Sequence, residues 1–276
     1  MAHRLGKVSD LRFSMPPGLE SATGYRRAAL VDADAGSVHT LLELNELEPG
    51  GLLPAHQHSY ETASFVLEGD AIVQIDGSAA RLGPGGYAVA GVGATRGWRN
   101  AGAGTLRWLD MSAPQPLPDS RPDLRLADRP VPDDAAPLSP GDPLPAPFGH
   151  FDRAAMPNPG AIPGIPIAYR GLVNESLGAE MLRTFIIELP PGTEVVLHDH
   201  PLEESYFLLE GECEITLADG RHPFRAGDFG WAGVNSPHAF HNTGPNPVRW
   251  LETQAPQPAR RHSIRHLGSW RRALDR

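Results

Sequence analysis

The sequence contains two copies of one unit, related by a constant offset of 142 residues, the separation of Pro49 from Pro191. One register holds over most of each copy without a gap, which indicates a duplication rather than chance. Each copy must then form the same supersecondary unit, and this limits the available folds more than any local pattern does. The matched segments are HQH (56–58) with HDH (198–200), LEG (67–69) with LEG (209–211), RWL (107–109) with RWL (249–251), and APQP (113–116) with APQP (255–258).

The local pattern of both copies is that of β-strands. Short runs of alternating or β-branched residues lie between turn residues, in a chain with 30 glycines and 29 prolines. So many turn residues leave little room for long helices. We therefore expect an all-β protein made of two tandem jelly-roll β-barrels, because closure of a barrel removes the strand edges that an open sheet would expose. The clearest runs are residues 39–47, 71–77, 183–189 and 213–220.

A proline-rich segment separates the two copies. Residues 114–147 contain eleven prolines, which remove backbone donors and favour an extended chain. We therefore expect an N-terminal domain at 1–113, a semi-rigid connector at 114–147 and a C-terminal domain at 148–276. The second domain ends in the basic sequence ARRHSIRHLGSWRRALDR, interpreted as a solvated tail or a short amphipathic helix.

The composition argues against several classes of function. A net charge of -9 disfavours nucleic acid, whose binding depends on lysines and arginines that neutralise phosphates. No apolar run approaches the roughly 20 residues of a membrane helix, and the N-terminal segment lacks the apolar region of a secretory signal. The expected location is therefore cytoplasmic. The single cysteine, Cys213, excludes an internal disulfide, and no serine-nucleophile triad, phosphate loop or dinucleotide motif is present.

The second copy brings titratable side chains to one face of a strand. His198 and His200 are two residues apart and so point the same way, and Glu204 keeps this parity whereas Glu203 faces away. His238 follows a glycine and proline turn on an element that can pack opposite in a barrel. Three imidazoles and one carboxylate suit Fe(II), Mn(II), Ni(II), Co(II) or Zn(II). The alternative is a set of hydrogen-bonded polar residues at a barrel mouth.

Two segments of the second copy resemble the paired motifs of the cupin family. Residues 192–211, GTEVVLHDHPLEESYFLLEG, are similar to the first motif, and residues 227–242, GDFGWAGVNSPHAFHN, to the second, with Gly233 where the family usually has proline. Because the unit is duplicated, the resemblance implies a bicupin. It also implies one divalent transition metal per chain, in the C-terminal domain, with Fe, Mn or Ni ahead of Zn or Co. The implied ligands are His198, His200, Glu204 and His238; Asn242 has a supporting role, and Tyr206, Phe240 and Asn242 are candidates to line the pocket.

The first copy departs from this pattern at two positions. It keeps His56 and His58, but Thr62 stands at the position of the carboxylate ligand and Arg96 at that of the last histidine. A guanidinium is always protonated and has no lone pair to donate to a metal. We therefore expect a degenerate first site of His56, His58, Glu61 and Arg96 without metal. Glu61 could replace the missing carboxylate or pair with Arg96, and Arg96 could also bind an anion.

The resemblance implies a metal-dependent enzyme that acts on a small organic molecule. Cupins with three histidines and one glutamate resemble dioxygenases and also oxalate-decarboxylating enzymes, and an oxidoreductase of the dioxygenase type is the first expectation. The alternatives are a non-oxidative metal-dependent lyase, isomerase or aminohydrolase, and a bicupin that binds a small molecule without turnover. No catalytic side chain can be named from the sequence. The expected partner is a small-molecule substrate, with no nucleic acid or membrane, and a homodimer is compatible with the sequence.

Overall fold

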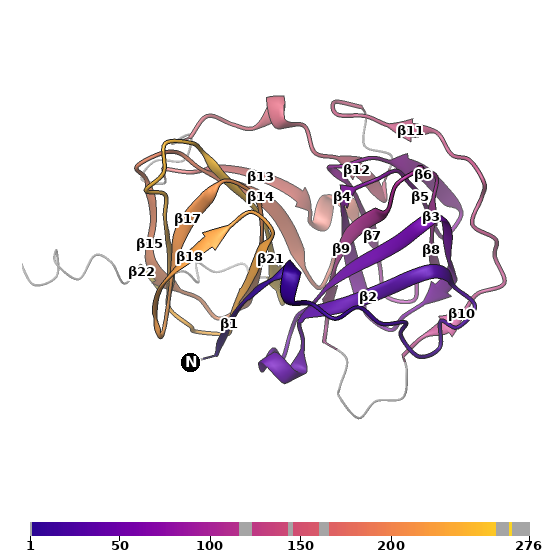
Figure 1. Ribbon diagram of the computed structural model, residues 1–276, viewed down its shortest axis with the longest axis horizontal. Helices are drawn as coiled ribbons and strands as arrows, with labels where there is room; N and C mark the ends of the chain where they lie inside the picture. The colour runs from indigo at the N-terminus through magenta and orange to yellow at the C-terminus, as the bar shows by residue number, and fades with distance from the viewer. Residues whose placement is uncertain (1, 116–122, 143–145, 160–165, 258–264, 267–276) are drawn as a thin grey trace, which may run out of the picture.

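Two β-barrels lie side by side in the computed structural model of the chain (Figure 1). The structure describes residues 2–115, 123–142, 146–159, 166–257 and 265–266. The regular elements of these residues are strands, apart from short 3-10 helices at Val8–Asp10, Ala33–Ala35, Arg153–Ala155 and Glu175–Leu177. The expected all-β class with two tandem jelly-roll barrels is therefore confirmed. Within the described ranges, no helix combines the length and the hydropathy needed to cross a membrane.

The first barrel is built on one curved sheet of eleven strands. The long strand β3 runs through its centre and pairs with β9 along one half of its length and with β8 along the other. The strands are β2 (Thr23–Val31), β3 (Leu41–Gln57), β4 (Glu61–Glu68), β5 (Ala71–Ile75), β6 (Ser78–Leu82), β7 (Gly86–Ala90), β8 (Arg96–Asn100), β9 (Leu106–Ala113), β10 (Arg125–Leu126), β11 (Pro137–Leu138) and β12 (Phe148–His150).

The second barrel divides into a six-stranded sheet, ordered β1-β19-β16-β21-β14-β13, and a five-stranded sheet, ordered β18-β17-β20-β15-β22. Here β14 and β15 replace the two halves of β3. Pro190 stands between them where the first copy has Glu48, and proline offers no N–H to a ladder. The strands are β1 (His3–Lys7), β13 (Ala168–Val173), β14 (Arg183–Leu189), β15 (Glu194–Asp199), β16 (Glu203–Glu210), β17 (Glu212–Leu217), β18 (Gly220–Arg225), β19 (Asp228–Ala232), β20 (His238–His241), β21 (Val248–Ala255) and β22 (Arg265–His266).

Each barrel has its own core, and a third apolar cluster lies between the barrels. Trp98 stacks on Trp108 at 4.4 Å between ring centroids in the first barrel, and the repeat equivalents Phe240 and Trp250 stack at 4.6 Å in the second. The cluster between the barrels contains equivalent residues from both copies. Its members include Leu44, Phe65 and Leu109 of the first copy and their equivalents Ile186, Phe207 and Leu251 of the second.

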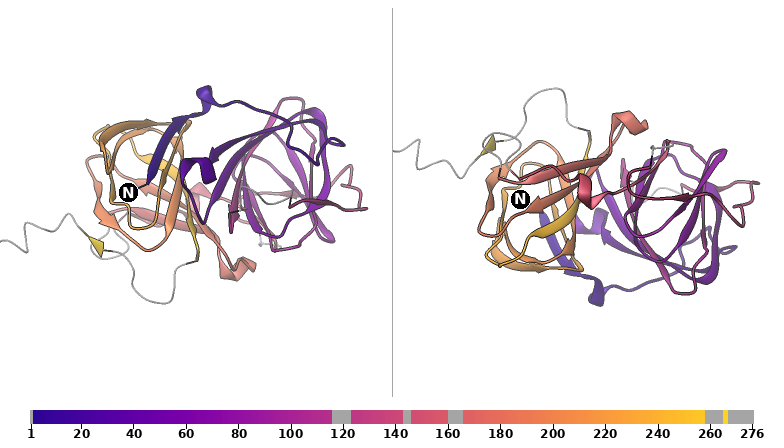
Figure 2. Two further views of the ribbon diagram at one scale, coloured as in Figure 1. Left: turned by 90° about the horizontal axis from the view of Figure 1, so that it is seen from below. Right: turned by 90° about the horizontal axis from the view of Figure 1, so that it is seen from above.

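The two copies exchange their first strands. β1 pairs with β19 of the second barrel, and β12 pairs with β7 of the first; both views in Figure 2 show the indigo N-terminal strand against the second barrel. β1 and β12 thus each pair with a strand of the other copy, across the domain boundaries expected at residues 113 and 148. Gly6 lies opposite Phe229 and Gly149 opposite Tyr87, and each aromatic ring covers its glycine so closely that a Cβ would overlap it.

The described parts of the proline-rich connector lie along the first barrel. β10 pairs with β3 at His56 and Gln57, and β11 runs parallel to β6. Arg99 of β8 donates hydrogen bonds to the carbonyl oxygens of Val131 and Pro132 at 3.2 and 3.1 Å. These residues extend the first barrel's sheet, in addition to connecting the two copies.

Replacement of Gly6 or Gly149 by alanine should destabilise the protein, because the new Cβ would meet the ring of Phe229 or Tyr87. Overpacking of this kind costs about 1–3 kcal/mol, a fall in Tm of about 2–4 °C for each kcal/mol. Gly104→Ala is the control, since nothing lies within 4 Å of its Cβ position. Thermal unfolding measures the effect. Equal Tm values for all three variants would contradict the close strand exchange.

Candidate metal centre

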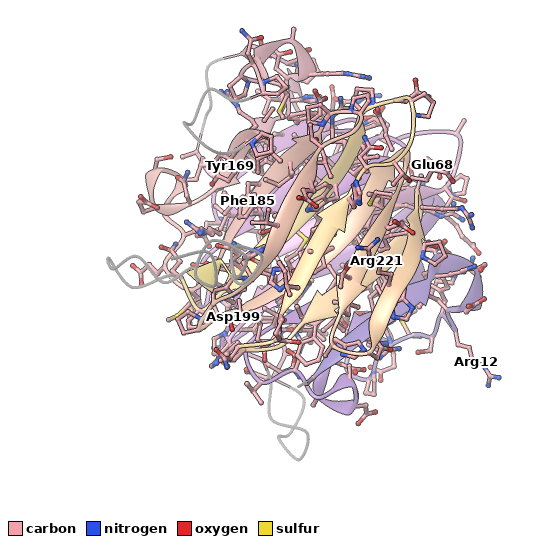
Figure 3. All side chains as sticks on the ribbon, turned by 90° about the vertical axis from the view of Figure 1, so that its left-hand side faces the viewer. Arg12, Glu68, Tyr169, Phe185, Asp199 and Arg221 are labelled. Carbon is pink, nitrogen blue, oxygen red and sulfur yellow. The ribbon has the colours of Figure 1, made fainter. Side chains whose placement is uncertain are left out.

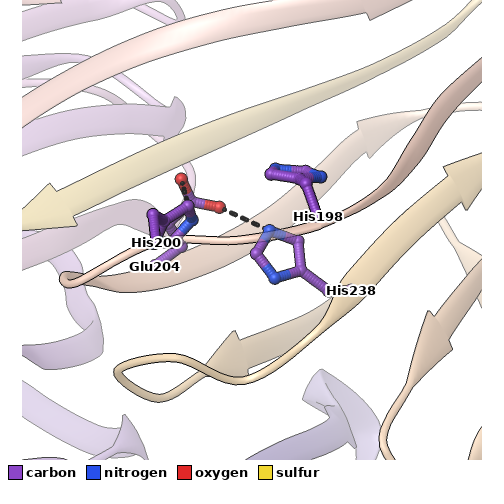
Figure 4. Close-up of side chains that lie close together, drawn as sticks. All are labelled: His198, His200, Glu204 and His238. Atoms are coloured by element: carbon purple, nitrogen blue, oxygen red, sulfur yellow. Dashed lines mark ion pairs between the residues drawn. The ribbon is translucent and has the colours of Figure 1, made fainter. Parts of the chain in front are cut away.

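Four side chains of the second barrel converge on one point. His198 lies on β15, His200 directly after it, Glu204 on β16 and His238 on β20, opposite His198 in the strand register. One nitrogen or oxygen atom of each lies within 4.8 Å of the others, as the close-up in Figure 4 shows. None of the four residues is more than 8% exposed. The structure thus brings together the whole ligand set that the resemblance implies.

The three imidazoles are held in the orientation that a metal ion requires. Their Nδ1 atoms lie 2.8, 3.0 and 2.9 Å from backbone carbonyl oxygens, which can only accept a hydrogen bond. Each Nδ1 can therefore donate to its carbonyl, which directs each Nε2 toward the common point, where it can bind a metal ion once it carries no proton. Backbone partners that fix the tautomer and ring orientation are typical of histidine metal ligands. The residues present fit a divalent ion. The pairs are His198 with Val196, His200 with Leu202, and His238 with Ser236.

Glu204 is the acceptor at the centre of the group. Its carboxylate accepts hydrogen bonds from the Tyr206 hydroxyl at 2.7 Å and from Gln254 Nε2, and the Nε2 atoms of His200 and His238 lie 2.8 and 3.1 Å from its oxygens. Burial raises the pKa of Glu204, but the two histidines outweigh burial and hold the pKa well below its usual value. A carboxylate that stays ionised in a buried site is suited to a cation.

The pKa values of His198 and His200 shift in opposite directions. Burial, assisted by the neighbouring His238, lowers the pKa of His198 to about 4. Burial also lowers the pKa of His200, but the charge of Glu204 outweighs it and the net shift is upward. His198 is therefore neutral near pH 7, the form in which imidazole binds a metal.

A cavity of about 510 Å³ opens beside the four residues, and His198, Glu204 and His238 form part of its wall. Most of the rest is apolar. Tyr169 and Phe185 lie near one another on the side of the second barrel shown in Figure 3, with ring centroids 4.7 Å apart. A pocket of this size with few polar groups suits a small organic molecule.

A row of hydrogen-bonded side chains runs from Glu204 across three strands. Gln254 on β21 lies opposite both Glu204 and Arg183 on β14. Its Nε2 donates to Glu204, and its Oε1 accepts from Arg183 Nε at 2.5 Å. The guanidinium lies over the Phe185 ring and lines the cavity. It forms no ion pair with any carboxylate of the described residues, so the cavity wall carries an unneutralised cation.

Glu252 supplies a second carboxyl group to the cavity wall. It accepts hydrogen bonds from Trp250 Nε1 at 2.9 Å and from Gln254 Nε2 at 3.2 Å. Burial, with the charge of Glu204 nearby, raises its pKa well above the usual value. The direction of this shift favours the protonated form of the carboxyl.

Sequence reasoning missed Arg183, Glu252 and Gln254. The available signal was alternation: in RWLETQ, the residues Trp250, Glu252 and Gln254 share one strand face. Two polar residues beside a buried tryptophan on that face indicate a lined pocket. No comparable signal marks Arg183, because its role depends on a neighbour 71 positions away.

The candidate lining residues have different positions. Phe240 lines the cavity. Tyr206 lies behind the metal centre and acts on it through Glu204. Asn242 does not line the cavity; it is fully buried and its Nδ2 donates to the carbonyl oxygens of Leu189 and Asn246 at 2.9 and 2.8 Å, which is a turn-holding role.

The predicted first site is only partly assembled. His56 and His58 lie with ring centroids 4.9 Å apart, but Glu61 is not with them and its carboxylate binds backbone N–H groups of the second copy. The suggested pairing of Arg96 with Glu61 is wrong. Arg96 is buried and its Nη1 pairs with Asp110, the repeat equivalent of Glu252, at 3.0 Å. The interior cation thus has a carboxylate of its own.

Comparison with known sequences and structures agrees with this architecture. The family model described as a cupin domain matches residues 44–112 and 185–253, together half of the chain. Dimethylsulfoniopropionate lyase DddQ of Ruegeria pomeroyi is 35% identical over 66 residues, which are 24% of this chain and 29% of that protein. The match thus spans less than a third of the relative's length.

Two oxalate decarboxylases are similar in structure. That of Lactobacillus farciminis, in a formate complex, has a TM-score of 0.69 and 17% identity, over 98% of this chain and 90% of the other. That of Bacillus subtilis has a TM-score of 0.70 and 16% identity, over 98% and 80%. At this identity the likeness concerns the fold.

His56→Gln should make the metal-free protein less sensitive to acid. Burial, with Arg96 nearby, lowers the pKa of His56 from 6.5 to about 3. The unfolded chain therefore binds a proton that the folded chain does not, and the free energy of unfolding falls as the pH drops below about 6.5. Without this histidine that fall should be smaller by about 1.4 kcal/mol per pH unit. Urea unfolding at several pH values measures it, and an unchanged pH dependence would contradict the lowered pKa.

Proposed function

The chain belongs to the cupin family, and on that premise we propose that its second barrel is the active site of a metal-dependent lyase for a small carboxylic acid. One observation carries the proposal. A single cavity is lined by members of the three-histidine, one-glutamate group, a carboxyl at Glu252 whose pKa is raised, and the guanidinium of Arg183, which forms no ion pair with a carboxylate of the described residues. These groups supply metal binding, proton transfer and anion binding, the three functions needed to cleave a carboxylic acid substrate.

His198, His200, Glu204 and His238 would hold one divalent ion per chain. Mn, Fe and Ni rank ahead of Zn and Co, and the structurally similar oxalate decarboxylase of Bacillus subtilis contains Mn(II) centres. When bound, such an ion supplies Lewis acidity that stabilises negative charge developing on a substrate oxygen. The first barrel takes no metal in this proposal, since Arg96 and Asp110 already pair there.

Arg183 binds the substrate carboxylate. Gln254 engages its Nε, which leaves the terminal amino groups to a ligand in the fork geometry that suits a carboxylate. Gln254 also links Arg183 to Glu204, so the anion-binding group lies in line with the metal centre. The substrate thus carries a carboxylate and a second oxygen group that reaches the metal centre. In the first barrel the corresponding residue is Leu41, opposite Ser112, and the cation is missing.

Glu252 transfers the proton. Loss of the substrate carboxylate as carbon dioxide breaks a carbon–carbon bond and leaves the electron pair on the remaining carbon, which must take up a proton. A buried carboxyl whose pKa is raised can donate it, and solvent then restores the acid. Trp250 and Gln254 fix the carboxyl in place.

Two considerations favour lyase chemistry over the dioxygenase type expected from the sequence. A cavity carboxyl with a raised pKa can transfer a proton to carbon, a role that dioxygen chemistry does not require. The curated relative is a lyase, and the structural neighbours are decarboxylases. These activities are those of the other proteins, and they support the reaction class proposed for this one.

The purified protein should contain close to one transition-metal ion per chain, measured by elemental analysis. His198→Ala and His238→Ala should lose it, because each removes one ligand nitrogen. His56→Ala, at the equivalent position of the first barrel, should keep it. Metal content that falls in His56→Ala, or persists in both second-barrel variants, would contradict the assignment.

Glu252→Gln should lower kcat on the acid that the wild-type protein cleaves by about 100-fold or more, the usual contribution of a general acid, with metal content unchanged. Arg183→Met should mainly raise KM, by about 10-fold or more, because a charge-assisted hydrogen bond contributes about 1.5–3 kcal/mol. Arg221→Met, on the outer surface of β18, is the control. The assay screens oxalate, dimethylsulfoniopropionate and keto acids against their amides.

An oxygen electrode run on the same panel, extended to enediols, catechols and flavonols, tests the alternative. Substrate-dependent oxygen consumption in step with turnover would overturn the lyase assignment in favour of a dioxygenase. Cleavage of an acid without oxygen consumption supports it.

A further inference from the structure

Glu203 extends out of the second barrel and is buried against the first. Its carboxylate accepts hydrogen bonds from the backbone N–H groups of Val38, His39 and Thr40 at 2.9, 3.0 and 3.1 Å, and from the Ser37 hydroxyl at 2.6 Å. Glu203 is 1% exposed. Hydrogen bonds to an ionised, buried acceptor are among the strongest in proteins, so segment 37–40 fixes this carboxylate firmly.

Glu61 makes the same contact in the opposite direction. Its carboxylate accepts from the backbone N–H groups of Glu180, Met181 and Leu182 at 2.7, 3.1 and 3.1 Å. These are the repeat equivalents of residues 38–40, and Ala179, without a hydroxyl, replaces Ser37. The two carboxylates therefore form a matched pair of contacts between the barrels.

Only one contact of the pair adjoins the metal centre. The carbonyl of Leu202, the residue before Glu203, accepts the hydrogen bond from His200 Nδ1 at 3.0 Å. Glu204, the residue after Glu203, belongs to the ligand set. The fixed side chain thus lies between the carbonyl that orients one ligand and the next ligand itself.

The first copy lacks this connection. Thr62 follows Glu61, and its hydroxyl pairs with Ser112 at 2.9 Å. His58, the equivalent of His200, bonds through Nδ1 to the carbonyl of Asp123 at 2.7 Å. The Glu61 contact therefore joins the barrels without holding any metal-centre residue.

We propose that Glu203 is a positioning residue of the metal centre, and that the first barrel acts through it to fix the segment from His200 to Glu204. A shift of about 0.5 Å in this segment is enough to spoil a preorganised site, and it would move both the Leu202 carbonyl and the Glu204 carboxylate. The first barrel thus contributes to a site it does not contain. The inference rests on the proposed metal site and adds a residue to it.

Glu203→Gln and Glu61→Gln test the proposal as a matched pair. Glutamine has one acceptor oxygen in place of two, so each variant loses hydrogen bonds of the same type between the barrels. The affinity for Mn²⁺ is measured by electron paramagnetic resonance of the free ion, and Tm is measured on the metal-free proteins. Tm should fall in both variants. The Mn²⁺ dissociation constant should rise about 10- to 100-fold in Glu203→Gln, the usual effect of losing a partner that orients a ligand, and should stay unchanged in Glu61→Gln.

Ser37→Ala gives a second, milder test that leaves the second barrel untouched. It removes one donor to Glu203 and makes the segment resemble its equivalent at Ala179. A smaller rise in the Mn²⁺ dissociation constant is expected, and it decides the question if Glu203→Gln does not fold.

Equal weakening of Mn²⁺ binding in Glu203→Gln and Glu61→Gln would overturn the proposal, because the contact would then act only through general stability. So would unchanged binding in both Glu203→Gln and Ser37→Ala. A wild-type protein that binds no Mn²⁺, Fe²⁺ or Ni²⁺ would refute the metal site itself. The failure of this inference is therefore distinguishable from that of the proposed function.

Discussion

The apolar face between the two barrels is the constraint on which the rest of the structure depends. Phe65 and Leu109 of one copy meet Phe207 and Leu251 of the other in a single buried cluster. Burial of each such side chain contributes about 1.5–3 kcal/mol, so neither face can be left in water. The copies therefore pack as a pair, related like the subunits of a symmetric dimer. This packing excludes water from the crossing carboxylates, and buried carboxylates persist only where donors surround them.

A symmetric scaffold here carries asymmetric chemistry. The first barrel encloses a cation with its own counter-charge, Arg96 with Asp110. In the second, His238 and Glu252 occupy those two positions, and the cation of the cavity wall, Arg183, forms no ion pair with a carboxylate of the described residues. Because an uncompensated buried charge is costly, the first interior is complete by itself. The second holds the buried Glu204 carboxylate beside three imidazoles, a group that suits a metal cation, so the two copies differ in what their interiors can bind.

Much of this could be predicted from the sequence, because it depends on periodicity and on the repeat. The alternation of side chains along a strand predicted that Glu204 faces the histidines and that Glu203 faces the other side. The structure confirms that Glu203 faces away from the ligand group. The match of Glu203 with Glu61 also indicated a role common to both barrels, and their reciprocal contacts confirm it. Other features could not be predicted. Arg96 forms its ion pair with Asp110 and not with Glu61. Arg183 lies opposite Gln254 in the strand register. Both contacts depend on how distant strands align, which no local sequence pattern specifies. The strand exchange is equally non-local.

The exchange of first strands sets an order for the assembly of the chain during synthesis. β1, at His3–Lys7, leaves the ribosome long before its partner β19, at Asp228–Ala232. Pairings between residues so distant in sequence form slowly, because the closure of a long loop precedes any gain from contact. The edge of β1 must therefore wait, unpaired, until most of the second copy has been made. A strand translated long before its partner is then fixed late, and it completes the edge of the sheet that carries Glu204.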